Sequence, residues 1–129
     1  MLTATDLNTG NFSALPTDGR LVVCLCAEWC GTCRTYREEF EALSEQFPGH
    51  IFIWIDVEDD SEWAGDIDVE NFPTLLVTEC DAVQFAGVML PHIGHLERLL
   101  GALSASSTKP PVDEAFRKAA SRFWATLTG

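Results

Sequence analysis

Hydrophobic positions change their period twice along the first half of the chain. Residues 20–27, RLVVCLCA, and residues 51–55, IFIWI, are two short apolar runs. Between them, over 36–47, apolar side chains recur every three or four residues, with Arg and Glu on the other face. A strand covered on both faces is apolar throughout, whereas an amphipathic helix has one apolar stripe. The pattern therefore predicts a buried strand, a helix that ends at Pro48-Gly49, and a second buried strand.

The second half of the chain continues with shorter elements. Residues 56–70 hold eight acidic side chains and no basic one, which indicates a short, irregular surface helix. Residues 74–78 and 82–86 have the composition of strands and lie three residues apart, so they predict an antiparallel hairpin. Leu and Ile at helical spacing over 93–103 predict a further helix. This order of elements predicts an α/β fold in which a sheet lies between helices.

The C-terminal part of the chain differs from this domain in composition and charge. Residues 104–111, SASSTKPP, have the composition of a linker, and residues 112–129 carry an apolar stripe that predicts a last helix. The first 103 residues hold 18 acidic and 4 basic side chains, whereas the rest hold 2 acidic and 4 basic ones. We therefore expect a domain over 1–103, a linker over 104–111, and a helical extension over 112–129 that can dock on the acidic domain.

Size, charge and cysteine usage narrow the function. The formal charge of −12 argues against nucleic acid and anionic membranes as partners, since both would be repelled. The first sixteen residues lack the basic and apolar regions of a signal peptide, and no apolar segment is as long as a membrane span. The five cysteines are an odd number and do not resemble a secreted disulfide framework. We expect a cytoplasmic protein whose cysteines serve redox or metal chemistry.

Cys30 and Cys33 fall where the first predicted strand gives way to the first helix. A thiolate that works near neutral pH needs stabilisation, and a helix N-terminus supplies it through unpaired N–H groups and the helix dipole. Cys30 is placed to attack a substrate disulfide, and Cys33 to displace it from the mixed disulfide. Two inert thiols, or zinc or iron–sulfur ligation together with Cys24 and Cys26, remain as alternatives. We expect Cys24 and Cys26 to be core residues, and a Cys24–Cys33 exchange disulfide is a further alternative.

Two motifs together carry a resemblance to a known family. The segment from Ala27 to Cys33, AEWCGTC, follows a buried strand, and NFPTLLV follows about forty residues later, starting at Asn71. Over roughly residues 12–103 the chain resembles the thioredoxin family. The resemblance implies the thioredoxin fold, a central mixed β-sheet flanked by helices, here with an extra C-terminal helix.

The resemblance also implies an activity and its partners. It implies a thiol–disulfide oxidoreductase that acts on protein disulfides, most simply as a reductase, with the redox-active disulfide Cys30–Cys33 and no metal or organic cofactor. The electrons would come from a thiol reductant such as a thioredoxin reductase. We expect a monomer or a weak dimer.

A substrate-binding surface follows from the same resemblance. Pro73 is expected to follow a cis peptide bond and to face the dithiol, and Phe72 to offer its backbone to an extended substrate segment. The residues expected to form this surface are Trp29, Gly31, Thr32, Phe72, Pro73 and Gly87.

Three positions depart from the family pattern. Thr32 replaces the usual Pro between the cysteines, which leaves the reduction potential open. Cys24 stands where a buried Asp assists proton transfer to the second cysteine, and Phe52 is matched to the Lys that pairs with that Asp. Cys24 is thus an expected modulator, and we expect resolution by Cys33 and release of the substrate to be slower than in thioredoxins at neutral pH. A competing interpretation is a thioredoxin-like binding or chaperone module with weak or no redox turnover.

Overall fold

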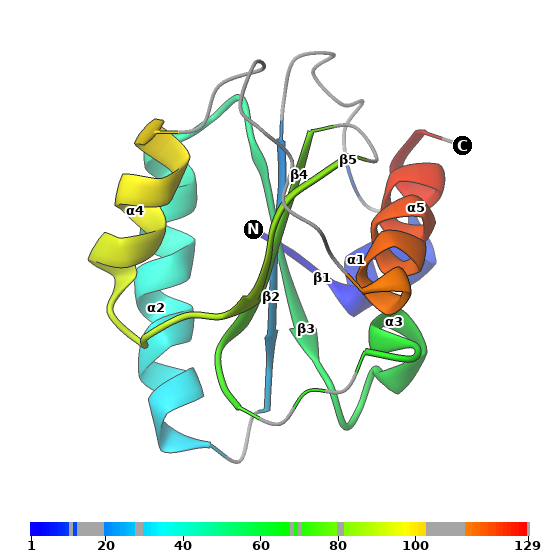
Figure 1. Ribbon diagram of the computed structural model, residues 1–129, viewed down its shortest axis with the longest axis horizontal. Coiled ribbons are helices and arrows are strands. Elements are labelled where there is room, and N and C mark those ends of the chain that lie inside the picture. The colour runs from blue at the N-terminus through cyan, green and yellow to red at the C-terminus, as the bar shows by residue number, and fades with distance from the viewer. Residues whose placement is uncertain are drawn as a thin grey trace.

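A computed structural model gives the fold of the chain (Figure 1). It describes residues 1–10, 12, 20–27, 30–67, 69, 71–79, 82–102 and 113–128. In chain order the elements are β1 (Leu2–Thr3), α1 (Ala4–Thr9), β2 (Arg20–Cys26), α2 (Gly31–Gln46), β3 (Ile51–Asp56), α3 (Ser61–Ala64), β4 (Thr74–Glu79), β5 (Ala82–Val88), α4 (Ile93–Ala102) and α5 (Glu114–Thr128). The linker expected over 104–111 lies outside the described residues.

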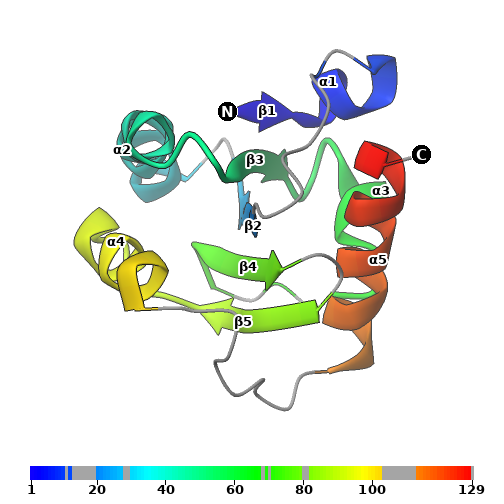
Figure 2. The same cartoon turned by 90° about the horizontal axis from the view of Figure 1, so that it is seen from above.

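The strands form one mixed sheet in the order β1-β3-β2-β4-β5. Strand β3 is parallel to β1 and to β2, whereas β4 is antiparallel to β2 and to β5. Helices α2 and α4 cover one face of the sheet, and α1, α3 and α5 cover the other (Figures 1 and 2). The predicted fold class, a mixed sheet flanked by helices with an extra C-terminal helix, is confirmed.

Strand β2 supplies both halves of the core. Successive side chains of a strand point to opposite faces, and in β2 they alternate between two buried clusters. Leu21, Val23 and Leu25 join the cluster that includes Phe123 of α5. Val22, Cys24 and Cys26 join the cluster under α2 and α4, which includes Cys33. Cys24, Cys26 and Cys33 therefore lie on the same side of the sheet.

The predicted hairpin is confirmed by the pairing of β4 with β5. Leu75 lies opposite Gly87, and the register shifts between Val77 and Thr78, where the ladder has an irregularity. Residues 80 and 81 of the connecting turn, and with them Cys80, lie outside the described residues.

The sequence pattern does not predict β1 and α1. Thr3 caps α1, because its hydroxyl accepts from the Asp6 N–H at 3.4 Å while its own N–H donates to the Asp6 carboxylate at 2.8 Å. Gly10 ends the helix in the left-handed conformation, with φ of 72°. Strand β1 has only two residues, so it has no periodicity to read. The signals that could have been read are the T-x-x-D spacing and Gly10.

Helix α5 packs on the domain through its apolar stripe. Phe123 is fully buried, and its ring stacks on Trp63 of α3 with centroids 5.2 Å apart. The guanidinium of Arg122 donates to the carbonyl of Trp63 at 3.1 Å. Helix α5 is thus docked against α3 and the sheet, through apolar packing and a hydrogen bond to a backbone carbonyl. No helix in the described part of the chain is long and apolar enough to cross a membrane.

Candidate active site: a cysteine cluster where β2 meets α2

Cys30 is the residue that begins helix α2. It has an extended conformation at the N-cap, with φ of −82° and ψ of 121°, and its side chain makes no capping hydrogen bond. Its backbone is fixed, because its N–H donates to the Ala27 carbonyl at 3.0 Å and its own carbonyl accepts from the Arg34 N–H at 3.1 Å. The thiol is free and partly exposed. Cys30 therefore presents an unused thiol at the positive end of a helix dipole.

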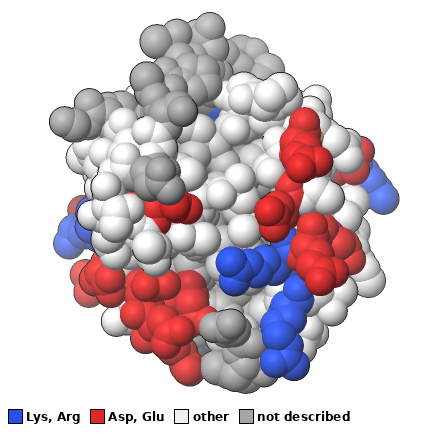
Figure 3. All heavy atoms as spheres, turned by 180° about the vertical axis from the view of Figure 1, so that it is seen from behind, with Lys and Arg blue, Asp and Glu red and all other residues white. Residues whose placement is uncertain are grey.

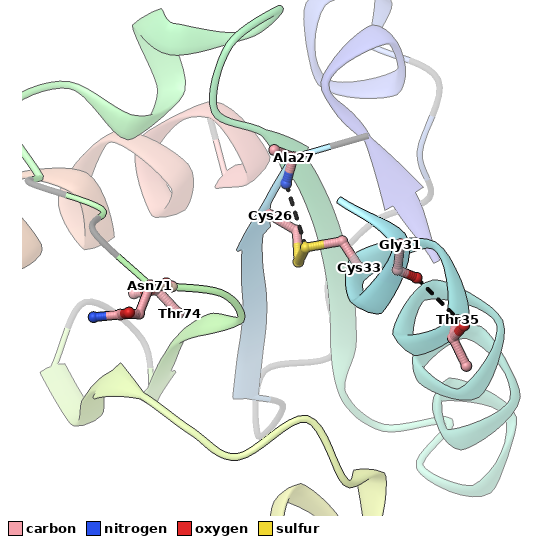
Figure 4. Close-up of a disulfide and its surroundings, with 7 residues drawn as sticks. All are labelled: Cys26, Ala27, Gly31, Cys33, Thr35, Asn71 and Thr74. Carbon is pink, nitrogen blue, oxygen red and sulfur yellow. Dashed lines mark hydrogen bonds between the residues drawn. A yellow bond between two sulfur atoms is a disulfide. The ribbon is translucent and has the colours of Figure 1, made fainter. Parts of the chain in front are cut away.

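Cys33 forms a disulfide with Cys26, the last residue of β2 (Figure 4). Both cysteines are fully buried, and the Cys33 sulfur also accepts the Ala27 N–H at 3.4 Å. The expected Cys30–Cys33 bridge is thus not the one present in this structure. Sequence reasoning missed Cys26 as a partner, because it treated Cys26 as a core residue.

The tertiary arrangement explains this pairing. The end of β2 lies beside the first turn of α2, so the Cα atoms of Cys26 and Cys33 are 5.9 Å apart, within the ordinary range for disulfides. Both side chains point into the layer between the sheet and α2. The bond also bears on the metal-site alternative, since two bonded sulfurs are not available as thiolate ligands. Among the described residues no group of three or more His, Cys, Asp or Glu is placed to hold a metal ion.

The segment that enters β4 lies next to this cluster. The peptide bond between Phe72 and Pro73 is cis, as expected. Leu25 lies opposite Thr74 in the antiparallel pairing of β2 with β4, so Pro73 and Cys26 are the next positions on the two strands. Phe72 and Cys30 both pack against the buried cluster that contains the disulfide. The structure thus brings the CxxC segment and the Pro73 segment together.

The other expected surface residues divide into three groups. Gly31 and Thr32 are exposed in the first turn of α2, and Trp29 lies outside the described residues. Gly87 has φ of 149°, a value that side-chain-bearing residues rarely adopt. The chain after Gly87 returns to the site, because the Met89 N–H donates to the Pro73 carbonyl at 3.1 Å.

Apolar and charged side chains surround this end of the molecule. Val88 and Leu90 flank Met89 and are 55% and 63% exposed, although both are large and apolar. Figure 3 shows acidic side chains gathered at one side of the lower part of the rear face, and acidic side chains mixed with basic ones at the other. The exposed acidic residues that follow β3 include Glu58, Asp59 and Glu62.

Comparison with known proteins agrees with this geometry. The thioredoxin family model matches residues 4–88. A thioredoxin H-type of Picea mariana is 34% identical over 95 residues, which cover 74% of this chain and 75% of that protein. A thioredoxin of Oryctolagus cuniculus is 40% identical over 57 residues, 44% of this chain and 54% of that protein. The solved structure of Fasciola hepatica thioredoxin matches with a TM-score of 0.61 and 25% identity, covering 77% of this chain and 92% of that one.

The chain belongs to the thioredoxin family. Membership of this family, together with a cysteine pair that forms a disulfide, supports thiol–disulfide exchange as the chemistry of the site. In this thioredoxin-family chain the disulfide lies deeper than the CxxC motif suggests, because it joins Cys33 to the strand and leaves Cys30 free.

The two positions matched to the family's Asp–Lys pair are both buried. Cys24, at the Asp position, is fully buried, and burial raises the pKa of its thiol. The residue opposite Cys24 on β3 is Trp54, whereas Phe52 lies opposite Val22. Phe52 and Trp54 are two residues apart on β3 and belong to the same buried cluster as Cys24, so both lie on the face of the sheet that carries Cys24. Both candidate positions are apolar, and neither supplies a cation to Cys24.

The surroundings of Cys24 favour neutral groups. Tyr36 of α2 is buried, and its hydroxyl has no hydrogen-bond partner among the described residues. Burial raises the pKa of Tyr36, and the charges of Cys24 and Glu39 raise it further. A thiolate inside this layer is therefore costly, whereas a thiolate at Cys30 is at the edge of the layer and at a helix terminus.

Proposed function

We propose that this protein reduces disulfides in protein substrates, with Cys30 as the attacking thiol and Cys33 as the resolving thiol. One observation carries the proposal. Cys30 is a free, partly exposed thiol at the start of α2, and Cys33, three residues later, is buried and engaged in a disulfide. An exposed nucleophile beside a buried thiol that can be oxidised is the arrangement that thiol–disulfide exchange requires.

The proposed reaction has two exchange steps. The Cys30 thiolate attacks one sulfur of the substrate disulfide, and the other substrate sulfur leaves as a thiolate and takes up a proton. The Cys33 thiolate then attacks the Cys30 sulfur, so the Cys30–Cys33 bond forms and the second substrate thiol is released. Two electrons pass from the protein to the substrate. A thiol reductant such as a thioredoxin reductase would return them.

The substrate would bind along the Pro73 segment. An extended client chain can pair with the backbone at Phe72, and the exposed Val88 and Leu90 offer an apolar contact on the same side. We include Trp29, Gly31, Thr32 and Gly87 in the proposed surface. The net charge of −12 favours clients that are neutral or basic near their disulfide. We place this reaction in the cytosol and expect a monomer or weak dimer.

Reduction of insulin by dithiothreitol tests the proposal. The wild-type protein should accelerate precipitation of the insulin B chain, and Cys30→Ser should return the rate to the uncatalysed level. Cys24→Ser is the matched control, because it removes a buried thiol from the same cluster without touching the attacking residue. Wild-type activity in Cys30→Ser would overturn the assignment of the nucleophile.

A second candidate function is a client-binding module without turnover. The observation that favours it is the Cys26–Cys33 bond itself, since it leaves Cys30 without a resolving thiol in this state. The test is suppression of aggregation of reduced, unfolded lysozyme by a variant that carries both Cys30→Ser and Cys33→Ser. Full suppression by this variant, with no insulin reduction by the wild type, would favour the binding function over the redox one.

A further inference from the structure

Cys33 is shared between two cysteines of this site. It is bonded to Cys26 at the end of β2, and it is the third residue of the helix that Cys30 caps. A side chain at the N-cap lies over the third helical residue, which is why capping side chains reach the backbone there. Cys30 also packs against the cluster that holds the disulfide. Cys26 and Cys30 are thus two candidate partners for the same sulfur atom, that of Cys33.

The two partners differ in exposure. Cys26 and Cys33 are fully buried, whereas Cys30 is partly exposed. A bond between Cys26 and Cys33 is therefore shielded from a protein reductant, and a bond between Cys30 and Cys33 would have one sulfur at the surface. Exchange of Cys33 between the two would move the disulfide from the surface to the interior.

We propose that Cys26 is a third reactive cysteine of this site, which competes with Cys30 for the sulfur of Cys33, so that the oxidised protein rests with a buried Cys26–Cys33 bond and a free Cys30 thiol. This inference rests on the proposed function for the Cys30–Cys33 step that precedes it. After a substrate has been reduced, the Cys26 thiolate attacks the Cys33 sulfur of the Cys30–Cys33 bond. The Cys26–Cys33 bond forms, the Cys30–Cys33 bond breaks, and Cys30 leaves as a thiolate.

This exchange is balanced without an external oxidant or reductant. One disulfide and one thiol are present before and after the step, and the proton lost by Cys26 is gained by Cys30 or by solvent. The two forms are isomers of one oxidation state, and their ratio depends on where the remaining thiol is more stable.

The position of the thiolate favours the buried bond. In the Cys30–Cys33 isomer the free sulfur is that of Cys26, inside an apolar layer where a charged thiolate is destabilised. In the Cys26–Cys33 isomer the free sulfur is that of Cys30, at the N-terminus of α2 and partly in water. The fold thus stabilises the isomer that the structure contains.

Cys24 provides a comparison within the same strand. It is buried on the same face as Cys26 but is free. It lies two residues further from the start of α2, which is roughly 6–7 Å along an extended strand. Position along β2, more than burial, therefore selects Cys26 as the partner of Cys33.

The consequence is a division of labour in the oxidised protein. Cys30 remains a thiol that can still form a mixed disulfide, but Cys33 is no longer available to resolve it. A protein reductant can reach the bond only after Cys30 has attacked Cys33 and returned the disulfide to the surface. Cys26 would thus slow the re-reduction of the oxidised protein by a large partner. A small dithiol could still reduce it, after Cys30 has attacked Cys33.

Acid-quenched mapping of the disulfides tests the proposal on the full chain. Fully reduced protein is mixed with insulin in a single turnover, quenched with acid at intervals, alkylated and mapped by mass spectrometry. We expect Cys30–Cys33 to appear first and then to convert to Cys26–Cys33 with alkylated Cys30. Insulin reduction that ends with Cys30–Cys33 alone would overturn the relay while leaving the proposed function standing. Absence of insulin reduction would instead count against the proposed function.

Oxidation without a substrate separates the two proposals further. With diamide as oxidant, the wild type and Cys24→Ser should both end with the Cys26–Cys33 bond, whereas Cys30→Ser, which lacks the exposed thiol that reacts first, should form this bond more slowly. Cys26→Ser, or Cys26→Ala where the serine variant does not fold, should stop at Cys30–Cys33 and lose the free Cys30 thiol. Formation of the Cys26–Cys33 bond in Cys30→Ser as fast as in the wild type would contradict the relay.

Discussion

Trp54 lies directly opposite Cys24 in the parallel pairing of β2 with β3. Both residues are buried, with Trp54 5% exposed, and Phe40 of α2 packs against the indole at a ring-centroid distance of 5.9 Å. The guanidinium of Arg37 covers the indole, 5.7 Å from the ring centre. The site at Cys24 is therefore built for an apolar group, and a carboxylate there would lose its hydration without gaining a facing cation.

Cys24→Asp should accordingly destabilise the protein in a pH-dependent way. Burial would raise the pKa of the new carboxyl above its unfolded value of about 4. The folded state then holds the proton more tightly than the unfolded chain, so the deficit grows as the pH rises through and above that value. We expect the free energy of unfolding to fall by about 3 kcal/mol at pH 8 and by less at pH 5. Urea unfolding at the two pH values measures this difference. Cys24→Ser is the control, and an equal deficit at both pH values would exclude a buried charge as the cause.

The same substitution tests whether Cys33 lacks a base. If proton removal from Cys33 limits release of the substrate, an Asp at position 24 should speed decay of the mixed disulfide at pH 7. The gain should disappear near pH 9, where the thiolate forms without assistance. Stopped-flow decay of a mixed disulfide between Cys30 and a chromogenic thiol measures this rate. No gain at pH 7, in protein shown to be folded, would mean that another step is limiting.

The exposed Leu90 should contribute to substrate binding. Covering a leucine side chain is worth about 1.5–3 kcal/mol, and 1.4 kcal/mol is a tenfold change. Leu90→Asp should therefore lower kcat/KM for insulin by about tenfold while leaving the urea midpoint unchanged. Ala125→Asp is the matched control, since it adds the same charge on α5, an exposed position on the other side of the sheet. Equal losses in both variants would indicate a general charge effect in place of docking.

Gly65 and Arg122 should be energetically coupled. Gly65 has φ of 58°, and a Cβ built on it would collide with the Arg122 guanidinium. Gly65→Ala should thus cost about 2 kcal/mol, from backbone strain together with displacement of Arg122 from the Trp63 carbonyl. In an Arg122→Ala background the same substitution should cost less, because the collision is gone. A double-mutant cycle from urea unfolding gives the coupling, and strict additivity would mean that the guanidinium is not held there.

The sequence predicts the elements that have a clear period. Strand β2, helix α2 and the β4–β5 hairpin follow from runs and stripes that tertiary packing then reinforces, because the same residues that set the pattern fill the two core clusters. Strand β1 could not be predicted from the sequence, because two residues have no period. Its order comes from its pairing with β3. Its register, Leu2 with Ile53, is a long-range fact that local patterns do not encode.

The disulfide partner of Cys33 could not be predicted from the sequence for a similar reason. Cys30 is close to Cys33 in the chain, and the motif makes that pair the natural expectation. Cys26 is seven residues away and in a different element, so its approach depends on how β2 ends beside α2. The register that puts Trp54 opposite Cys24 is equally a property of the sheet. Motifs identify the reactive residues here, whereas strand ends and registers decide which of them meet.

Because of His50, the free energy of unfolding should decrease as the pH is lowered from 7 to 5.5. Burial lowers the pKa of its imidazole, the Gly49 backbone partly offsets this, and Arg20 lowers the pKa further. Its ring stacks on Phe47 with centroids 5.4 Å apart, and its Nδ1 has no partner among the described residues.

The sign of this effect follows from proton binding by the two states. Because the folded pKa is below the unfolded value of about 6.5, the unfolded chain binds the proton more readily. The contribution of His50 to stability is fully present above the unfolded pKa. It is lost as the pH falls from the unfolded pKa towards the folded one. His50→Gln should flatten this part of the curve in urea unfolding, while His92→Gln, which changes an exposed histidine, should leave it as in the wild type. A wild-type curve that is already flat from pH 7 to 5.5 would show that His50 protonates equally in both states.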